Sequence, residues 1–117
     1  MNSNVLEAEL RRARRVTQLG RVTFRSDFGV RGVASLQDLS TTGCRVVSER
    51  PLQVGMELEL CLCVASKEHN IEIEWAKVRW ADGQCFGLEF MAICPLERER
   101  LRLFLKTVVV GPSAPLT

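Results

Sequence analysis

The sequence predicts a mainly β fold: a small six-stranded antiparallel β-barrel with a short N-terminal helix or arm and a C-terminal α-helix. Between residues 16 and 90, apolar and polar residues alternate with a period of two in short runs that end at turn residues. From Pro95 onward the apolar spacing becomes helical. A closed barrel is favoured over an open sheet because closure leaves no strand edge unpaired. The 117 residues fit a single domain.

The composition limits the classes of function. The apolar fraction of 46% and the charged fraction of 26% are ordinary for a globular protein, and the net charge of +2 is too small to drive tight nucleic-acid binding. No apolar run approaches the ~20 residues of a membrane helix. The first residues lack the basic and apolar regions of a signal peptide. We therefore expect a cytoplasmic protein without membrane insertion.

The cysteines do not form a recognisable metal site. None of the five belongs to a Cys-x-x-Cys pair, and the chain contains a single histidine, so we expect no metal. An odd count of cysteines without a signal peptide indicates reduced, mostly buried thiols. The residues concerned are Cys44, Cys61, Cys63, Cys85, Cys94 and His69.

The N-terminal 15 residues are expected to form an arm that carries a basic cluster. Residues 3–12 are typical of a short helix, which Ser3 or Asn4 can cap. A helix of this length is marginal on its own, so we expect it to become ordered only on docking or on ligand binding. Residues 16–108 are then predicted to form the barrel and the final helix, and residues 109–117 a flexible tail.

The first three strands are predicted at residues 16–25, 33–39 and 44–48, with turns at residues 28–32 and 41–43. The fourth run, residues 56–65, alternates strictly. Its leucines and a valine share one face, whereas Glu57, Glu59, Cys61 and Cys63 share the other. Because two cysteines lie on this acidic face, we expect another element or a partner to cover part of it.

The last two strands are predicted to form a hairpin around Asp82-Gly83. A change in the alternation near residues 75–76 indicates a β-bulge. The apolar residues expected on the inner face are Ile71, Ile73 and Trp75 before the bulge, and Ala76, Val78 and Trp80 after it. In the final helix the predicted apolar stripe consists of Leu96, Leu101, Phe104 and Leu105.

Two short segments suit the recognition of a small anionic ligand. Arg11 and Arg15 lie four residues apart, and guanidinium forks suit phosphates and the O6/N7 edge of guanine. Asp38 and Ser40 can add hydrogen bonds, and Gly43 allows a close backbone approach. The structural alternatives are a solvated basic helix end and an ordinary Asx or Ser/Thr turn with its glycine at positive φ.

Both segments resemble the signature of the PilZ domain family: Arg-x-x-x-Arg, followed later by Asp/Asn-x-Ser-x-x-Gly. Residues 78–80 and 87–90 further resemble the Val-x-Trp and Gly-x-x-Phe segments of the family's end strands. The resemblance implies a six-stranded barrel with a C-terminal helix and a receptor for cyclic di-GMP. It would assign the phosphate and guanine contacts to Arg11 and Arg15, and hydrogen bonds to the ligand to Asp38 and Ser40. Gly43 would permit close approach, and Arg12 and Arg14, outside the motif, would add only charge.

The expected function is therefore a cyclic di-GMP receptor whose arginine-bearing segment changes conformation on binding and signals to an unidentified protein effector. The ligand is the only small molecule implied, and the chain is expected to be a monomer or a homodimer. No nucleophile–base pair is evident, so we expect no enzyme activity. Two alternatives stay open. One is a PilZ-fold adaptor that does not bind the nucleotide, and the other, with less support, is a small barrel that binds nucleic acid.

Overall fold

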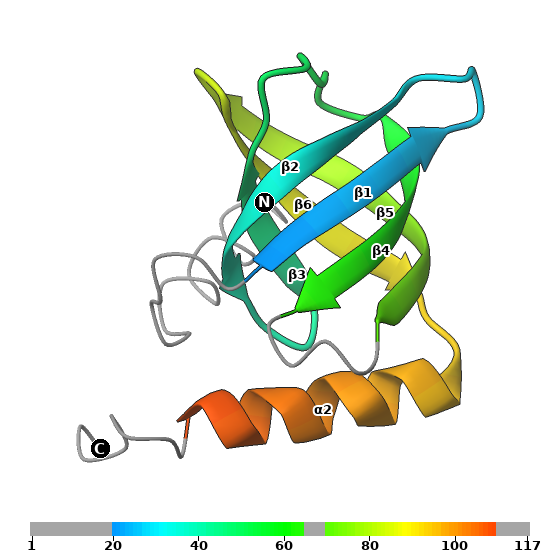
Figure 1. Ribbon diagram of the computed structural model, residues 1–117. Helices are drawn as coiled ribbons and strands as arrows, with labels where there is room; N and C mark the ends of the chain where they lie inside the picture. Colours follow the sequence, from blue (N-terminus) through cyan, green and yellow to red (C-terminus); the bar gives the residue numbers. More distant parts are fainter. Residues whose placement is uncertain (1–19, 65–69, 110–117) are drawn as a thin grey trace.

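The computed structural model describes residues 20–64 and 70–109, which form a closed six-stranded barrel followed by one helix (Figure 1). All neighbouring strands are antiparallel, in the order β1-β2-β3-β6-β5-β4 around the barrel. The mainly β barrel with a C-terminal helix confirms the predicted fold class. The elements are β1 (Gly20–Ser26), β2 (Arg31–Leu39), β3 (Gly43–Val47), β4 (Glu57–Val64), β5 (Ile71–Asp82), β6 (Cys85–Ala92) and α2 (Pro95–Val109).

The core fills the interior of the barrel with the inward-facing residues of every strand. In β4 the alternation is strict, and Leu58, Leu60, Leu62 and Val64 are all buried, as the sequence predicts. The turn between β5 and β6 contains Gly83 at a φ of 65°, in the left-handed region that a tight hairpin requires. Because the sheet closes on itself, each described strand has two hydrogen-bonded neighbours.

Two register shifts in β5 change the direction in which the side chains of its two tryptophans point. The predicted bulge is confirmed between Trp75 and Ala76, and a second shift lies between Val78 and Trp80. Ala76 and Val78 are fully buried, but Trp75 is 39% exposed and Trp80 is half-buried outside the core, so the predicted inward positions of both tryptophans are wrong. The extra residue of the bulge turns Trp75 away from the core.

The helix α2 lies across one end of the barrel and packs against β5 (Figure 1). Leu101 is fully buried beneath it, and Phe104 and Leu105 pack at the edge of the core. Leu96, which was predicted to belong to the same stripe, is 62% exposed instead. At about 100° per residue, Leu96 points roughly 140° away from Leu101, which explains why the two cannot share one face.

Several predictions fall outside the described residues: the N-terminal helix at residues 3–12, the start of the first strand at residues 16–19 and the tail from residue 110 onward. Among the described helical residues, none form a helix long and apolar enough to span a membrane.

Candidate ligand-binding site

Asp38 lies near the end of β2, where the strand departs from regular alternation. The register with β3 shifts between Leu36 and Asp38, so that both Asp38 and the following Leu39 are buried. Arg45 stands opposite Asp38 on β3 and forms an ion pair with its carboxylate. The carboxylate is fully buried, whereas the arginine side chain retains 28% of its exposure. The ion pair therefore connects a buried carboxylate to a guanidinium that solvent can reach.

Ser40 organises the turn from β2 to β3. Its backbone N–H donates to the Gly43 carbonyl at 2.9 Å, and its hydroxyl accepts the N–H of Thr42 at 3.2 Å. The same hydroxyl lies 3.3 Å from the Thr42 hydroxyl and 3.4 Å from the Gly43 carbonyl oxygen. These contacts are those of a Ser/Thr turn, so the structural alternative for Ser40 holds at least in part.

Gly43 is the first residue of β3, where it pairs with Glu89 of β6. It is buried and lies between two neighbouring strands rather than at the tip of a turn. The positive φ expected for this glycine is found instead at other glycines, including Gly29 and Gly83. Gly43 therefore does not occupy a left-handed turn.

Residues that the sequence reasoning missed continue the site across the outer face of the barrel. Arg45 pairs with Gly87 of β6, and Gly87 pairs in turn with Trp80 of β5. The Trp80 indole covers Gly87 so closely that a Cβ built on the glycine would lie 2.1 Å from the indole Nε1. Asp38, Arg45, Gly87 and Trp80 therefore form one cross-strand row over β2, β3, β6 and β5.

This row, hereafter the motif face, combines a charged end with an aromatic end. Cys85 lies beside it: burial raises the pKa of its thiol, Arg45 opposes this shift, and the carboxylates of Asp82 and Asp38 add to it. On the next outward positions, the Arg79 Nε donates to the Glu89 carboxylate at 2.5 Å. The face can thus offer a guanidinium, a planar ring and hydrogen-bonding groups to a ligand.

The structure brings together three of the predicted site residues, Asp38, Ser40 and Gly43. The predicted arginines, Arg11 and Arg15, and the auxiliary residues Arg12 and Arg14 lie outside the described residues. Within residues 20–64 and 70–109 no cluster of His, Cys, Asp or Glu could hold a metal ion. The signal for Arg45 was present in the sequence as an outward position on the third strand, but its pairing with Asp38 depends on the register.

Comparison with known proteins identifies the fold. The family model described as "PilZ domain" matches residues 9–106. The PilZ domain of CeSA from a cellulose-synthesizing bacterium superposes with a TM-score of 0.60 and 12% identity, over 82% of this chain and 98% of that one. The PilZ domain of YcgR from Escherichia coli, solved with c-di-GMP, gives a TM-score of 0.63 and 15% identity, over 90% and 97%.

A third similar structure is the Bacillus subtilis inhibitor of motility, MotI/DgrA, with a TM-score of 0.64 and 21% identity. It matches 84% of this chain but only 50% of that protein. At these identities the structural likenesses establish the fold alone. A search of curated protein sequences gave no match.

Proposed function

The chain belongs to the PilZ domain family, and from this premise we propose that it is a receptor for cyclic di-GMP that signals to a protein partner. The observation that carries the proposal is the motif face, where Asp38 pairs with the guanidinium of Arg45 and Ser40 follows directly after the end of the same strand. PilZ proteins bind cyclic di-GMP and often act on protein effectors.

In the proposed complex, Arg11 and Arg15 hold the phosphates and guanine bases by bidentate contacts. Asp38 and Ser40 bond the ligand from the barrel, and Gly43 leaves room for it. Arg12 and Arg14 add positive charge nearby. A ligand that bridges the barrel and the arginine-bearing segment changes the conformation of that segment and hence the surface that a partner meets.

An adaptor that does not bind the nucleotide is the second candidate, and one specific observation favours it. Asp38 already pairs with Arg45, and the Ser40 hydroxyl already accepts the Thr42 N–H. Both residues therefore have a structural role whether or not a ligand binds.

Calorimetric titration with cyclic di-GMP tests the receptor proposal. We expect binding at micromolar concentration or tighter, weakened about ten- to a hundredfold in Arg15→Ala and in Ser40→Ala, because each loses one contact to a charged ligand. Arg102→Ala is the matched control. It removes an exposed arginine that pairs with Glu99 on α2, and its affinity should equal that of the wild type.

Absence of heat with folded wild-type protein would favour the adaptor. Amide hydrogen exchange of residues 5–18, with and without saturating ligand, tests the proposed conformational change of the arginine-bearing segment. We expect the exchange rates to differ between the two states. Equal exchange in the two states would contradict it.

A further inference from the structure

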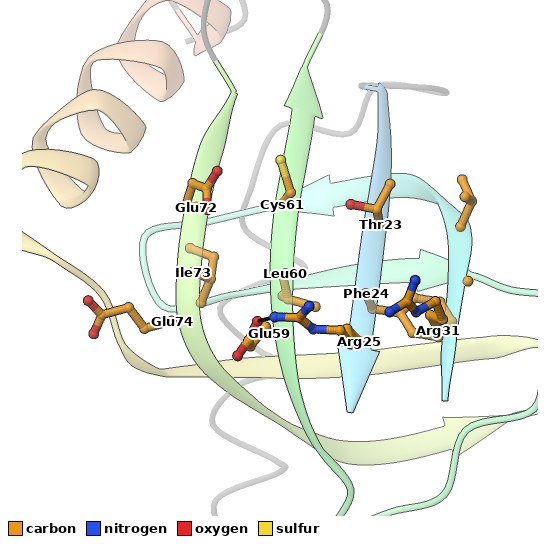
Figure 2. A pocket seen from close by; sticks show the side chains of 12 residues that line it. Thr23, Phe24, Arg25, Arg31, Glu59, Leu60, Cys61, Glu72, Ile73 and Glu74 are labelled. Carbon is orange, nitrogen blue, oxygen red and sulfur yellow. Dashed lines mark hydrogen bonds and ion pairs between the residues drawn. The ribbon is translucent and has the colours of Figure 1, made fainter. Parts of the chain in front are cut away.

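A groove of about 690 Å³ lies on the outer surface of β1, β2, β4 and β5. In the order of strands around the barrel, β1 and β4 lie opposite β3 and β6, which carry much of the motif face. Figure 2 shows Thr23, Cys61 and Glu72 on three neighbouring strands of this groove, where they stand opposite one another in the register. The groove is therefore a surface distinct from the proposed ligand site.

The charged lining of the groove consists of the carboxylates Glu59, Glu72 and Glu74 and the guanidiniums Arg25 and Arg31. Glu59 forms an ion pair with Arg25, and 2.5 Å separates the Glu59 Oε1 from the Arg25 Nη2 (Figure 2). Glu72 and Glu74 on β5 also line it, and their side chains form no ion pair with any residue in the described ranges. The β5 side of the groove thus carries two carboxylates outside any described ion pair, whereas Arg31 lies on the β2 side (Figure 2).

One cross-strand row of the groove, from Val33 through Thr23 to Cys61, is uncharged and ends at Glu72. Val33 is 57% exposed there, and Trp75 is exposed in a hollow that adjoins the groove. Burial raises the pKa of Cys61 to about 11, with the neighbouring Cys63 thiol and the Glu72 carboxylate adding to the shift. The Cys61 thiol is consequently neutral at physiological pH. An uncharged strip next to the two carboxylates of β5 suits a segment that alternates basic and small apolar side chains.

The closed barrel restricts how a partner can bind this surface. Since each described strand already has two neighbours, a partner cannot add a strand to an edge and must bind through side chains. Glu72 and Glu74 are two residues apart on one strand, about 6.6 Å along it, which matches alternate residues of an extended segment. The helix α2 covers one end of the barrel and leaves this flank open (Figure 1).

We propose that this groove, the acidic groove, binds a basic segment of a protein partner. Arginine or lysine side chains of the segment meet Glu72 and Glu74, and its small apolar side chains pack on the neighbouring β4 at Cys61. The inference rests on the proposed function only in that the proposed receptor signals to a protein partner. The binding step itself does not require the nucleotide.

The test uses the full chain and two synthetic peptides. In one, arginine alternates with valine; in the other, glutamate replaces the arginine. Alkylation of each cysteine at mildly alkaline pH is followed by mass spectrometry. We expect the arginine peptide to slow alkylation of Cys61 and to leave unchanged that of Cys85, a half-buried thiol at the motif face. The glutamate peptide should protect neither cysteine.

The double variant Glu72→Gln/Glu74→Gln should weaken peptide binding by about tenfold, since each exposed ion pair contributes up to a few-fold in affinity. Glu99→Gln is the matched control, because it removes an exposed carboxylate on α2, and it should leave binding unchanged. Protection of Cys85 as strong as that of Cys61, or unchanged affinity in the double variant, would overturn the proposal.

The chain's own arginine segment is the competing occupant. If Arg11→Gln/Arg15→Gln speeds alkylation of Cys61 without any peptide, that segment fills the groove and the proposal is wrong. Calorimetry keeps this question separate from the receptor proposal. The Glu72→Gln/Glu74→Gln variant should bind cyclic di-GMP as the wild type does, and a wild type that binds no nucleotide would leave the peptide result standing.

Discussion

Replacing Gly87 by alanine should destabilise the barrel through a clash with Trp80. A Cβ at this position would lie 2.1 Å from the indole Nε1 and 2.3 Å from Cε2. Ordinary contacts begin at roughly 3.5 Å, so the ring has to move by about 1.4 Å. Overpacking of this kind costs about 1–3 kcal/mol. The backbone of Gly87 does not lie in the left-handed region, so the whole penalty comes from the ring.

The effect of Gly87→Ala on the free energy of unfolding should change from destabilising to stabilising when the Trp80 ring is removed. In a Trp80→Ala background the new methyl group meets no indole, and alanine in a strand is about 0.5–1 kcal/mol more favourable than glycine. A double-mutant cycle should therefore give a coupling of about 2 kcal/mol between the two positions.

Urea unfolding followed by far-ultraviolet circular dichroism measures all four members of the cycle, because the readout does not depend on the removed fluorophore. Gly29→Ala is the control: Gly29 has a φ of 86° with open space around it, so its cost should be the same with or without Trp80. If Gly87→Ala destabilises both backgrounds equally, Trp80 does not determine the need for glycine at this position.

Two further perturbations test the motif face and the core by the same unfolding assay. Asp38→Ala should lower the free energy of unfolding by about 2–3 kcal/mol. This is less than the loss expected for a fully buried pair, because the remaining Arg45 side chain is 28% exposed and can be hydrated. A loss below about 0.5 kcal/mol would show that the ion pair is unimportant for stability. Burial raises the pKa of the Cys44 thiol, so above pH ~9 the unfolded chain releases a proton that the folded chain retains, and stability should fall with rising pH by up to about 1.4 kcal/mol per unit. Cys44→Ala should flatten this slope, and an equal slope in the variant would exclude Cys44 as its source.

The sequence predicts well where alternation alone decides the position of a side chain. Leu58, Leu60 and Leu62 are buried because nothing interrupts the period of two in β4. Prediction fails where a bulge or a helical angle intervenes. The bulge was predicted, yet the side on which Trp75 emerges depends on which residue is the extra one, and local pattern does not determine that.

In the candidate site, the residues that are close in the sequence could be predicted, but the neighbours that other strands contribute could not. The segment from Asp38 to Gly43 is recognisable because its residues are close in the sequence. The neighbours of this segment come from other strands: Arg45 stands opposite Asp38 only in the shifted register of β2 with β3. Trp80 meets Gly87 only through the register of β5 with β6. Cross-strand pairs of this kind depend on the alignment of whole strands.

Barrel closure also determines how the motif face and the acidic groove can communicate. The motif face is built on β2, β3, β6 and β5, and the acidic groove on β1, β2, β4 and β5, so only β2 and β5 contribute to both. Each of these two strands contains a register shift, between Leu36 and Asp38 and between Trp75 and Ala76. A bulge disrupts the hydrogen-bonded ladder locally and increases the twist of the strand. Asp38 of the motif face and Glu72 and Glu74 of the acidic groove therefore lie on the two strands that the surfaces share, and each of these strands contains a register shift.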